Sequence, residues 1–167
     1  MESPVTVREE PAQTVVFVRR QGAFAHIPEA MQTLLTHLQD NGLTPHGPPV
    51  GVFYDDPRTV PEAEARWEVY WAVAEPQPER APEGAPGGDA VGVRHIAARQ
   101  LATVLHTGPY DQVGPAYARA VSWLGDRGYT IVGPSEEAYL SGPDTPPETI
   151  KTEIRFPVAK APISYAT

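Results

Sequence analysis

The chain has 167 residues, of which 41% are hydrophobic and 20% charged, and its formal net charge is −8 at pH 7. This length allows one domain, or two small fused halves, with a substantial core. The negative charge disfavours a nucleic-acid partner, because binding to phosphates requires a basic surface. The chain contains no cysteine, which excludes disulfides, thiolate metal ligands and a thiol nucleophile.

The N-terminus and the hydropathy of the chain bear on its location. Residues 1–4 contain neither the basic nor the apolar part of a secretory signal, and no run of about 18 apolar residues occurs. We therefore expect a soluble, cytoplasmic protein that does not contact a membrane. Arginine greatly outnumbers lysine, and alanine and proline are abundant, which is typical of a bacterium with a GC-rich genome.

The first half of the chain is predicted to contain two strands, a helix and two further strands. These elements are expected over residues 5–8, 14–20, 28–42, 50–54 and 66–73. The first two runs are rich in β-branched residues and a turn separates them, so we expect them to pair as a hairpin. The helix is predicted from apolar residues at helical spacing after Pro28, and it ends at Asn41 and Gly42.

Residues 75–90 are rich in Pro, Gly, Glu and Ala and offer almost nothing to bury, so they predict a mobile connector. The elements beyond it follow the same pattern as the first half. A second hairpin is expected from residues 91–96 and 101–107, a second helix over residues 113–127, and a last strand over residues 151–158.

The two halves match each other at the offset that places Gly22 on Gly108, which is 86 residues. The same offset superposes further glycine, proline and aromatic pairs: Phe24 and Tyr110, Gly42 and Gly128, Gly47 and Gly133, Pro48 and Pro134, Phe53 and Tyr139. We infer an internal duplication within one domain spanning residues 1–167, with halves 1–74 and 91–160 joined by the connector 75–90. The expected fold is α+β: two βαββ units form an eight-stranded antiparallel sheet with two helices on one face and a ligand cleft on the other.

Two strands place a glutamate between apolar neighbours. In residues 151–158 the side chains of Ile154 and Phe156 share one face of the strand, and Glu153 shares the other with Arg155. Residues 66–73 repeat this pattern with Glu68 and Tyr70 on the polar face. If the helices cover the apolar face, the two glutamates lie on the opposite face, where a cleft between the halves is expected.

Aromatic residues are expected around the same cleft: Phe24 and Tyr110 at the starts of the helices, and Phe53, Tyr54, Tyr139 and Tyr70 on strands. A carboxylate among aromatic rings attracts a lipophilic cation through charge, apolar burial and cation–π contacts of about 0.5–2 kcal/mol each. The alternative is a purely structural role. Glu153 can equally pair with Arg155 or Lys151 on a solvent-exposed face, and Tyr110 and Tyr139 can be core residues.

Other motifs do not predict a metal or cofactor. The five histidines lack the spacing of metal ligands, and only His106, which precedes the Gly108-Pro109-Tyr110 turn, is a candidate ligand-binding residue. Asp55 and Asp56 are typical of a turn. No phosphate-binding loop, dinucleotide fingerprint or nucleophile elbow is present, so no cofactor and no metal are expected.

The second half resembles a known family. The residues that carry this resemblance are the His106 to Tyr110 segment, Gly133-Pro134, Tyr139-Leu140 and the closing strand 151–158. Together they are similar to the GyrI-like small-molecule-binding domain, which is also the effector domain of multidrug-responsive regulators of the AraC and MerR types. The resemblance implies that Glu153 is the central anionic residue for aromatic or lipophilic cations, with Tyr110, Tyr139, Phe53 and Tyr70 around it.

Three roles are compatible with this resemblance. The first, which we favour, is a stand-alone protein that binds varied hydrophobic cations, since only residues 1–4 precede the first strand and no helix-turn-helix segment is found. The second is a hydrolase that opens cyclopropane rings of toxins with Glu153 as general base; Glu68, Tyr70 or His106 could assist. The third, ranked last, is inhibition of DNA gyrase through an acidic surface. The oligomeric state is not predicted.

Overall fold

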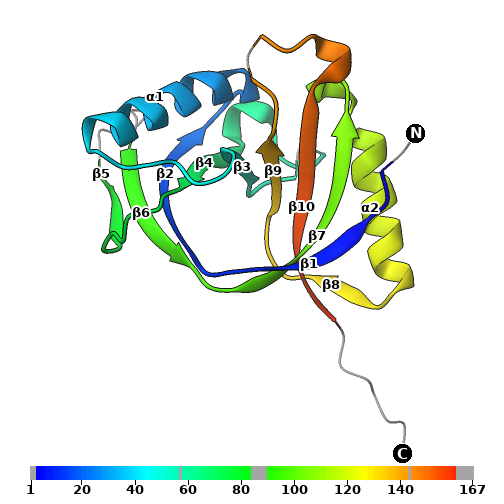
Figure 1. Cartoon of the computed structure of the whole chain (residues 1–167). Helices are drawn as coiled ribbons and strands as arrows, with labels where there is room; N and C mark the ends of the chain where they lie inside the picture. The colour runs from blue at the N-terminus through cyan, green and yellow to red at the C-terminus, as the bar shows by residue number, and fades with distance from the viewer. Residues whose placement is uncertain (1–2, 57, 84–89, 143, 161–167) are drawn as a thin grey trace, which may run out of the picture.

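The computed structural model describes residues 3–56, 58–83, 90–142 and 144–160, which form two helices and one ten-stranded sheet (Figure 1). The helices are α1 (Ile27–Asp40) and α2 (Gly114–Asp126). The strands are β1 (Thr6–Glu10), β2 (Gln13–Gln21), β3 (Val50–Phe53), β4 (Arg66–Ala72), β5 (Arg80–Glu83), β6 (Ala90–Ile96), β7 (Arg99–Thr107), β8 (Tyr129–Ile131), β9 (Ser135–Tyr139) and β10 (Lys151–Lys160). The expected α+β class is confirmed, with β5 and β8 as additions to the eight expected strands.

All strand pairs in the described part of the sheet are antiparallel, and their order is β1-β7-β10-β9-β3-β4-β2-β6-β5, with β8 pairing with the C-terminal end of β10. The two halves of the duplication therefore meet where β3 pairs with β9. In this pair Gly51 lies opposite Glu137, at the centre of the sheet.

The leading strand of each half pairs with the other half, so both predicted hairpins are wrong. Strand β1 pairs with β7, not with β2, and β6 pairs with β2, not with β7. The two exchanges are equivalent under the duplication. Thr6 faces Thr103 in one and Gly92 faces Phe17 in the other, and the repeat offset matches Thr6 with Gly92 and Phe17 with Thr103. The short links after β1 and β6 thus carry the chain from one half of the sheet to the other. Turn-forming residues alone do not distinguish such a crossing from a hairpin.

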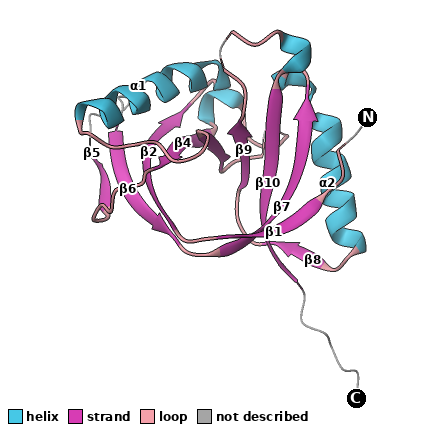
Figure 2. Cartoon of the chain, in the orientation of Figure 1, coloured by secondary structure: helices cyan, strands magenta, loops and turns pink. Residues whose placement is uncertain are grey.

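Each helix covers the strands of its own half (Figure 2). Helix α1 packs on β2 and β4 through Ile27, Ala30, Leu34 and Leu38, which recur at helical spacing and are buried. Helix α2 packs on β7 and β8 through Ala116, Ala120 and Leu124. Full burial of each leucine contributes about 1.5–3 kcal/mol to folding. The central strands β3 and β9 lie between the two helix-covered regions.

The connector 75–90 contributes β5, which pairs with β6 at the edge of the sheet. The sequence did not predict the strand Arg80–Glu83 within the connector, because backbone hydrogen bonds to an open sheet edge do not require apolar side chains. Residues 84–89 of the connector lie outside the described residues. No helix in the described part of the chain is long and apolar enough to span a membrane.

Candidate functional site

The nine residues predicted to surround one cleft lie on two different faces of the sheet. Glu153, Glu68, Tyr70 and Tyr54 lie on the face away from the helices, where Tyr70 belongs to a buried cluster with Val15, Phe17, Val50, Val52, Ala72 and Ala138. Phe24, Phe53, Tyr110, Tyr139 and His106 lie on the face that carries the helices.

Glu153 is held by two arginines. Arg8 of β1 donates to both carboxylate oxygens of Glu153, at 2.8 and 3.1 Å, and Arg155 Nε donates at 2.7 Å. Burial alone would raise the pKa of Glu153, but the hydrogen bonds from these arginines outweigh it and hold the pKa below its usual value. Its negative charge is therefore already balanced within the protein, and the exchanged strand β1 supplies the main partner.

Glu68 has the equivalent arrangement in the first half. It is completely buried, accepts hydrogen bonds from Tyr54 and Arg94, and lies 3.7 Å from Arg19. Arg94 comes from the exchanged strand β6 and matches Arg8 at the offset of the duplication. Each half thus places one arginine across the exchange onto the glutamate of the other half.

A third ion pair lies between the first two. Tyr70 donates to Glu136 of β9 at 2.5 Å, and Arg99 donates to the same carboxylate at 2.6 and 3.1 Å. Burial and the charge of Glu136 raise the pKa of Tyr70, so the phenol stays protonated as the donor. The carboxylates on this face are thus engaged in a structural network of arginines and tyrosines.

The helix-bearing face has a different carboxylate at the centre of the molecule. Glu137 of β9 lies directly opposite Gly51 of β3, in the seam between the two halves. A side chain at Gly51 would lie 2.7 Å from the hydroxyl of Tyr139 and 3.4 Å from Phe53, so the glycine leaves the room that these rings occupy beside Glu137. We call Glu137 and the residues around it on this face the seam site.

Glu137 is partly buried and has a neutral hydrogen-bond donor in place of a cation. The hydroxyl of Tyr117, on α2, donates to it at 2.6 Å. Burial raises the pKa of Glu137, and the hydrogen bonds from Tyr117 and Tyr139 offset only part of this. Among the described residues no arginine or lysine forms an ion pair with Glu137, in contrast to Glu68, Glu136 and Glu153.

Aromatic rings flank Glu137 on both sides of the seam. Tyr110 packs edge to face on Tyr139 at 5.8 Å between ring centroids, and Phe24 packs in the same way on Phe53 at 5.5 Å. Tyr139 is buried, whereas Tyr110 is 47% exposed, so its ring is open to solvent. Edge-to-face packing leaves ring faces free for other contacts.

His106 lies near this group but has its own partner. Its Nε2 is 3.0 Å from the carbonyl oxygen of Pro109, which fixes the turn before Tyr110. In the sheet, His106 on β7 and Tyr139 on β9 both lie level with Thr152 of β10. No group of residues that could hold a metal ion is found in the described part of the chain.

The sequence prediction missed Glu137 and Tyr117. A signal for Glu137 was present, because alternation along Ser135–Tyr139 places Glu137 and Tyr139 on one face and Glu136 on the other. No comparable signal existed for Tyr117, since its distance from Glu137 depends on how α2 packs against the sheet.

Comparisons with known proteins agree with this architecture. The family model of the GyrI-like small molecule binding domain matches residues 3–159. The crystal structure of the EcmrR C-terminal domain has a TM-score of 0.79 at 24% identity over 96% of this chain and 100% of that domain. In the complex of EcmrR with DNA, the matched region is 58% of the EcmrR chain.

Two further structures have the same fold. A hydrolase from Listeria innocua has a TM-score of 0.68 at 14% identity, over 95% of this chain and 93% of the hydrolase. The structure of SAV2435 bound to tetraphenylphosphonium has a TM-score of 0.55 at 14% identity, over 93% and 94% of the two chains. No curated protein sequence matches this chain significantly. Since the family match spans nearly the whole chain, the protein belongs to the family of the GyrI-like small molecule binding domain.

Proposed function

We propose that the protein binds hydrophobic or aromatic cationic compounds at the seam site, with Glu137 as the anionic centre. The observation that carries this proposal is the pairing of the carboxylates. Glu153, Glu68 and Glu136 are each neutralised by arginine, whereas Glu137 is partly buried and accepts hydrogen bonds from the neutral phenols of Tyr117 and Tyr139. A partly desolvated carboxylate without a counter-charge is costly, and a cationic guest removes that cost.

The surroundings of Glu137 suit a lipophilic guest. Tyr110, Tyr139 and Phe53 offer cation–π and apolar contacts, each cation–π contact being worth about 0.5–2 kcal/mol. SAV2435, which has the same fold, was captured with tetraphenylphosphonium, a bulky aromatic cation. This proposal moves the anionic role from Glu153, where the sequence placed it, to Glu137. It keeps Tyr110, Tyr139, Phe53 and Phe24 as ligand-binding residues.

The test compares two ions of similar size and opposite charge. Tetraphenylphosphonium and tetraphenylborate are titrated into the protein by calorimetry, with Glu137→Gln, Glu153→Gln and the exposed-site control Glu148→Gln in parallel. We expect the cation alone to bind, and Glu137→Gln to weaken binding about 10- to 100-fold, as for loss of a charge-assisted contact of about 1.5–3 kcal/mol. Glu153→Gln and Glu148→Gln should change affinity less than threefold, or about 0.6 kcal/mol.

Two results would contradict the proposal. Equal binding of both ions would show that charge does not direct recognition. Loss of cation binding in Glu153→Gln with retention in Glu137→Gln would return the anionic role to the last strand. Thermal unfolding of each variant controls for loss of the folded state.

A second candidate function is hydrolysis of an electrophilic ring, favoured by the pKa of Glu137. A general base works best when its pKa lies near the working pH, and burial raises the pKa of Glu137 but the arginines lower that of Glu153. Glu137 would accept a proton from water as the water oxygen attacks the strained carbon. The carbon–carbon bond of the ring breaks, and its electron pair takes up that proton.

The hydrolase from Listeria innocua, which has the same fold, supports examining this reaction. Turnover of a cyclopropane-containing electrophile that is lost in Glu137→Gln and kept in Glu153→Gln would establish it. Tight binding of the same compound without release of a ring-opened product would leave the protein as a binder.

A further inference from the structure

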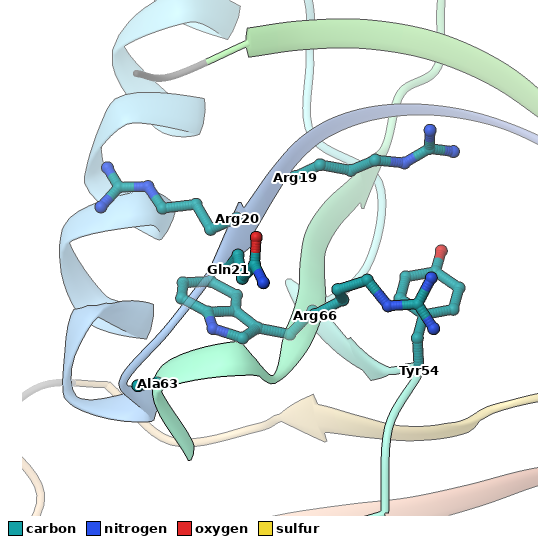
Figure 3. Close-up of a pocket in the computed structure, with 7 residues that line it drawn as sticks. Arg19, Arg20, Gln21, Tyr54, Ala63 and Arg66 are labelled. Atoms are coloured by element: carbon teal, nitrogen blue, oxygen red, sulfur yellow. The ribbon is translucent and has the colours of Figure 1, made fainter. Parts of the chain in front are cut away.

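A pocket of about 630 Å³ lies at the C-terminal end of β2 and the N-terminal end of β4, apart from the seam site. It is lined by Arg19, Arg20, Gln21, Tyr54, Ala63, Arg66 and Trp67 (Figure 3). This volume falls within the usual range of small-molecule sites, about 300–1,000 Å³. No acidic side chain is among these lining residues, although the chain as a whole carries a formal charge of −8.

The arginines of this pocket are not equivalent. Figure 3 shows Arg19, Tyr54 and Arg66 on one side of β2, whereas Arg20 extends toward α1, where it contacts Glu29. Arg66 is chelated by Asp55, with contacts of 2.8 and 3.0 Å from its guanidinium. Those contacts occupy Nε and Nη2 of Arg66, so Nη1 remains for another acceptor.

Arg19 carries charge that its surroundings do not balance. Its side chain is 53% exposed, and among the described residues its one acidic neighbour is Glu68, 3.7 Å away and beyond hydrogen-bond distance. Glu68 is at the same time the acceptor for Arg94. Two guanidinium groups therefore share a single carboxylate, which leaves about one positive charge at the pocket.

The duplication supplies an internal comparison that separates fold from function. Around Glu153, the equivalent pair of Arg8 and Glu153 is accompanied by Arg155 and Glu10, so two arginines face two carboxylates. At the offset of the duplication Glu10 matches Ile96, so the second acid is missing around Glu68. The group around Glu153 is therefore neutral, whereas the group around Glu68 is positive.

Two of the residues that line the pocket have no polar counterpart in the second half. At the offset of the duplication Arg19 matches Leu105 and Tyr54 matches Leu140. The second half thus forms its glutamate–arginine contact without either polar group, so the fold does not require them. Arg19 is further oriented by the ring of Phe17, whose centroid lies 4.8 Å from its guanidinium carbon.

From these observations we infer that the pocket at Arg19, Tyr54 and Arg66 is a binding site for small organic molecules that carry a carboxylate or phosphate group. A guanidinium recognises both oxyanions through paired hydrogen bonds, and the partly exposed ring of Tyr54 provides an apolar surface for the rest of the molecule. The ligand class is opposite in charge to that of the seam site, so the two sites are independent.

The experiment is a two-dimensional ¹⁵N–¹H NMR titration with benzoate, phenyl phosphate and inorganic phosphate, with benzylammonium as the control of opposite charge. We expect at least one of the three anions to shift the backbone amides of Gln21 and Arg66, and benzylammonium to leave them unchanged. The response to benzoate or to the phosphates identifies which oxyanion the site prefers.

Arg19→Leu copies the residue of the second half and should weaken anion binding at least tenfold, while Arg19→Lys should retain part of it. The control is Arg127→Leu, an arginine that lies over Trp123 at the end of α2. Cation binding at the seam site should be unchanged in Arg19→Leu, which separates the two proposals. Absence of binding by all three anions, or equal affinity in wild type and Arg19→Leu, would overturn the inference.

Discussion

Glu153, which the sequence resemblance favours as the anionic residue, and Glu137, which we propose instead, should affect stability in opposite directions when each is replaced by glutamine. Glu153→Gln removes the carboxylate that accepts three hydrogen bonds from Arg8 and Arg155. Arg155 is almost fully buried and would lose its carboxylate acceptor, whereas Arg8 is partly exposed, can be hydrated and keeps its contact with Glu10. We expect a loss of about 2–3 kcal/mol in the free energy of unfolding at neutral pH.

Glu137→Gln should instead stabilise the ligand-free protein. The glutamine keeps the shape of the side chain and can still accept the hydrogen bond from Tyr117, but it removes a partly buried charge that has no counter-ion. Relief of this cost is worth about 1 kcal/mol at neutral pH. For a domain of this length the two changes correspond to a decrease of about 4–12 °C and an increase of about 2–4 °C in the melting temperature.

The pH dependence of the two variants differs in sign. The pKa of Glu153 is lowered by folding, so its contribution to stability is present above the usual carboxyl pKa and is lost as the pH falls through the folded value. The pKa of Glu137 is raised by folding. Below the usual carboxyl pKa, Glu137 is protonated and does not lower the free energy of unfolding of the wild type. As the pH rises through the pKa of Glu137 in the folded protein, the wild type loses stability and Glu137→Gln becomes the more stable protein.

Urea unfolding at neutral and acidic pH measures both effects, with Glu148→Gln as the exposed control. Loss of stability in both variants at neutral pH would refute the assignment of Glu137 as a carboxylate without a counter-charge. No loss in Glu153→Gln would show that the contacts with Arg8 and Arg155 contribute nothing net.

Two further changes test the packing of the sheet and of the seam site. Gly92→Ala should lower the free energy of unfolding by about 1–3 kcal/mol, because the new methyl group would lie 2.5 Å from Phe17 and 2.9 Å from a backbone carbonyl. This loss should be smaller when Phe17→Leu is also present. Additive losses in the double variant would contradict the prediction. Tyr117→Phe should leave the edge-to-face contact with Phe156 in place but weaken tetraphenylphosphonium binding about tenfold at neutral pH, since the ionised form of Glu137 loses a hydrogen bond. Tyr129→Phe is the control. Equal affinities of the wild type and both variants would argue against a role of the Tyr117 hydroxyl.

The duplication, the antiparallel α+β architecture and the apolar faces of both helices could be predicted from the sequence. Periodicity is a local property, and Leu34 and Leu38 or Ala120 and Leu124 indicate the buried face wherever the helix packs. The match between the halves at one offset further indicates two βαββ units. The aromatic residues Tyr110, Tyr139, Phe53 and Phe24 could be placed near one another from the sequence, because the turns and strands that carry them are defined locally; their role in binding stays a prediction.

Strand partners could not be obtained in the same way. The turns after β1 and β6 are equally compatible with a hairpin and with a crossing to the other half, and the choice depends on contacts between residues far apart in the chain. This exchange brings Arg8 to Glu153 and Arg94 to Glu68. A glutamate that looked available on its own strand was thereby neutralised by an arginine about 145 residues away.

The sequence by itself determined the repeat, the type of the two helices and of eight of the ten strands, and the buried face of each helix, because these follow from local spacing of apolar residues. Only the tertiary structure decided that Glu68, Glu136 and Glu153 are paired with arginine and that Glu137 is not. Electrostatic balance depends on distances between side chains from different strands and helices, and these distances are set by strand order and helix packing. For this reason Glu153 carries the sequence signal, whereas Glu137, in the seam between β3 and β9, carries the unbalanced charge.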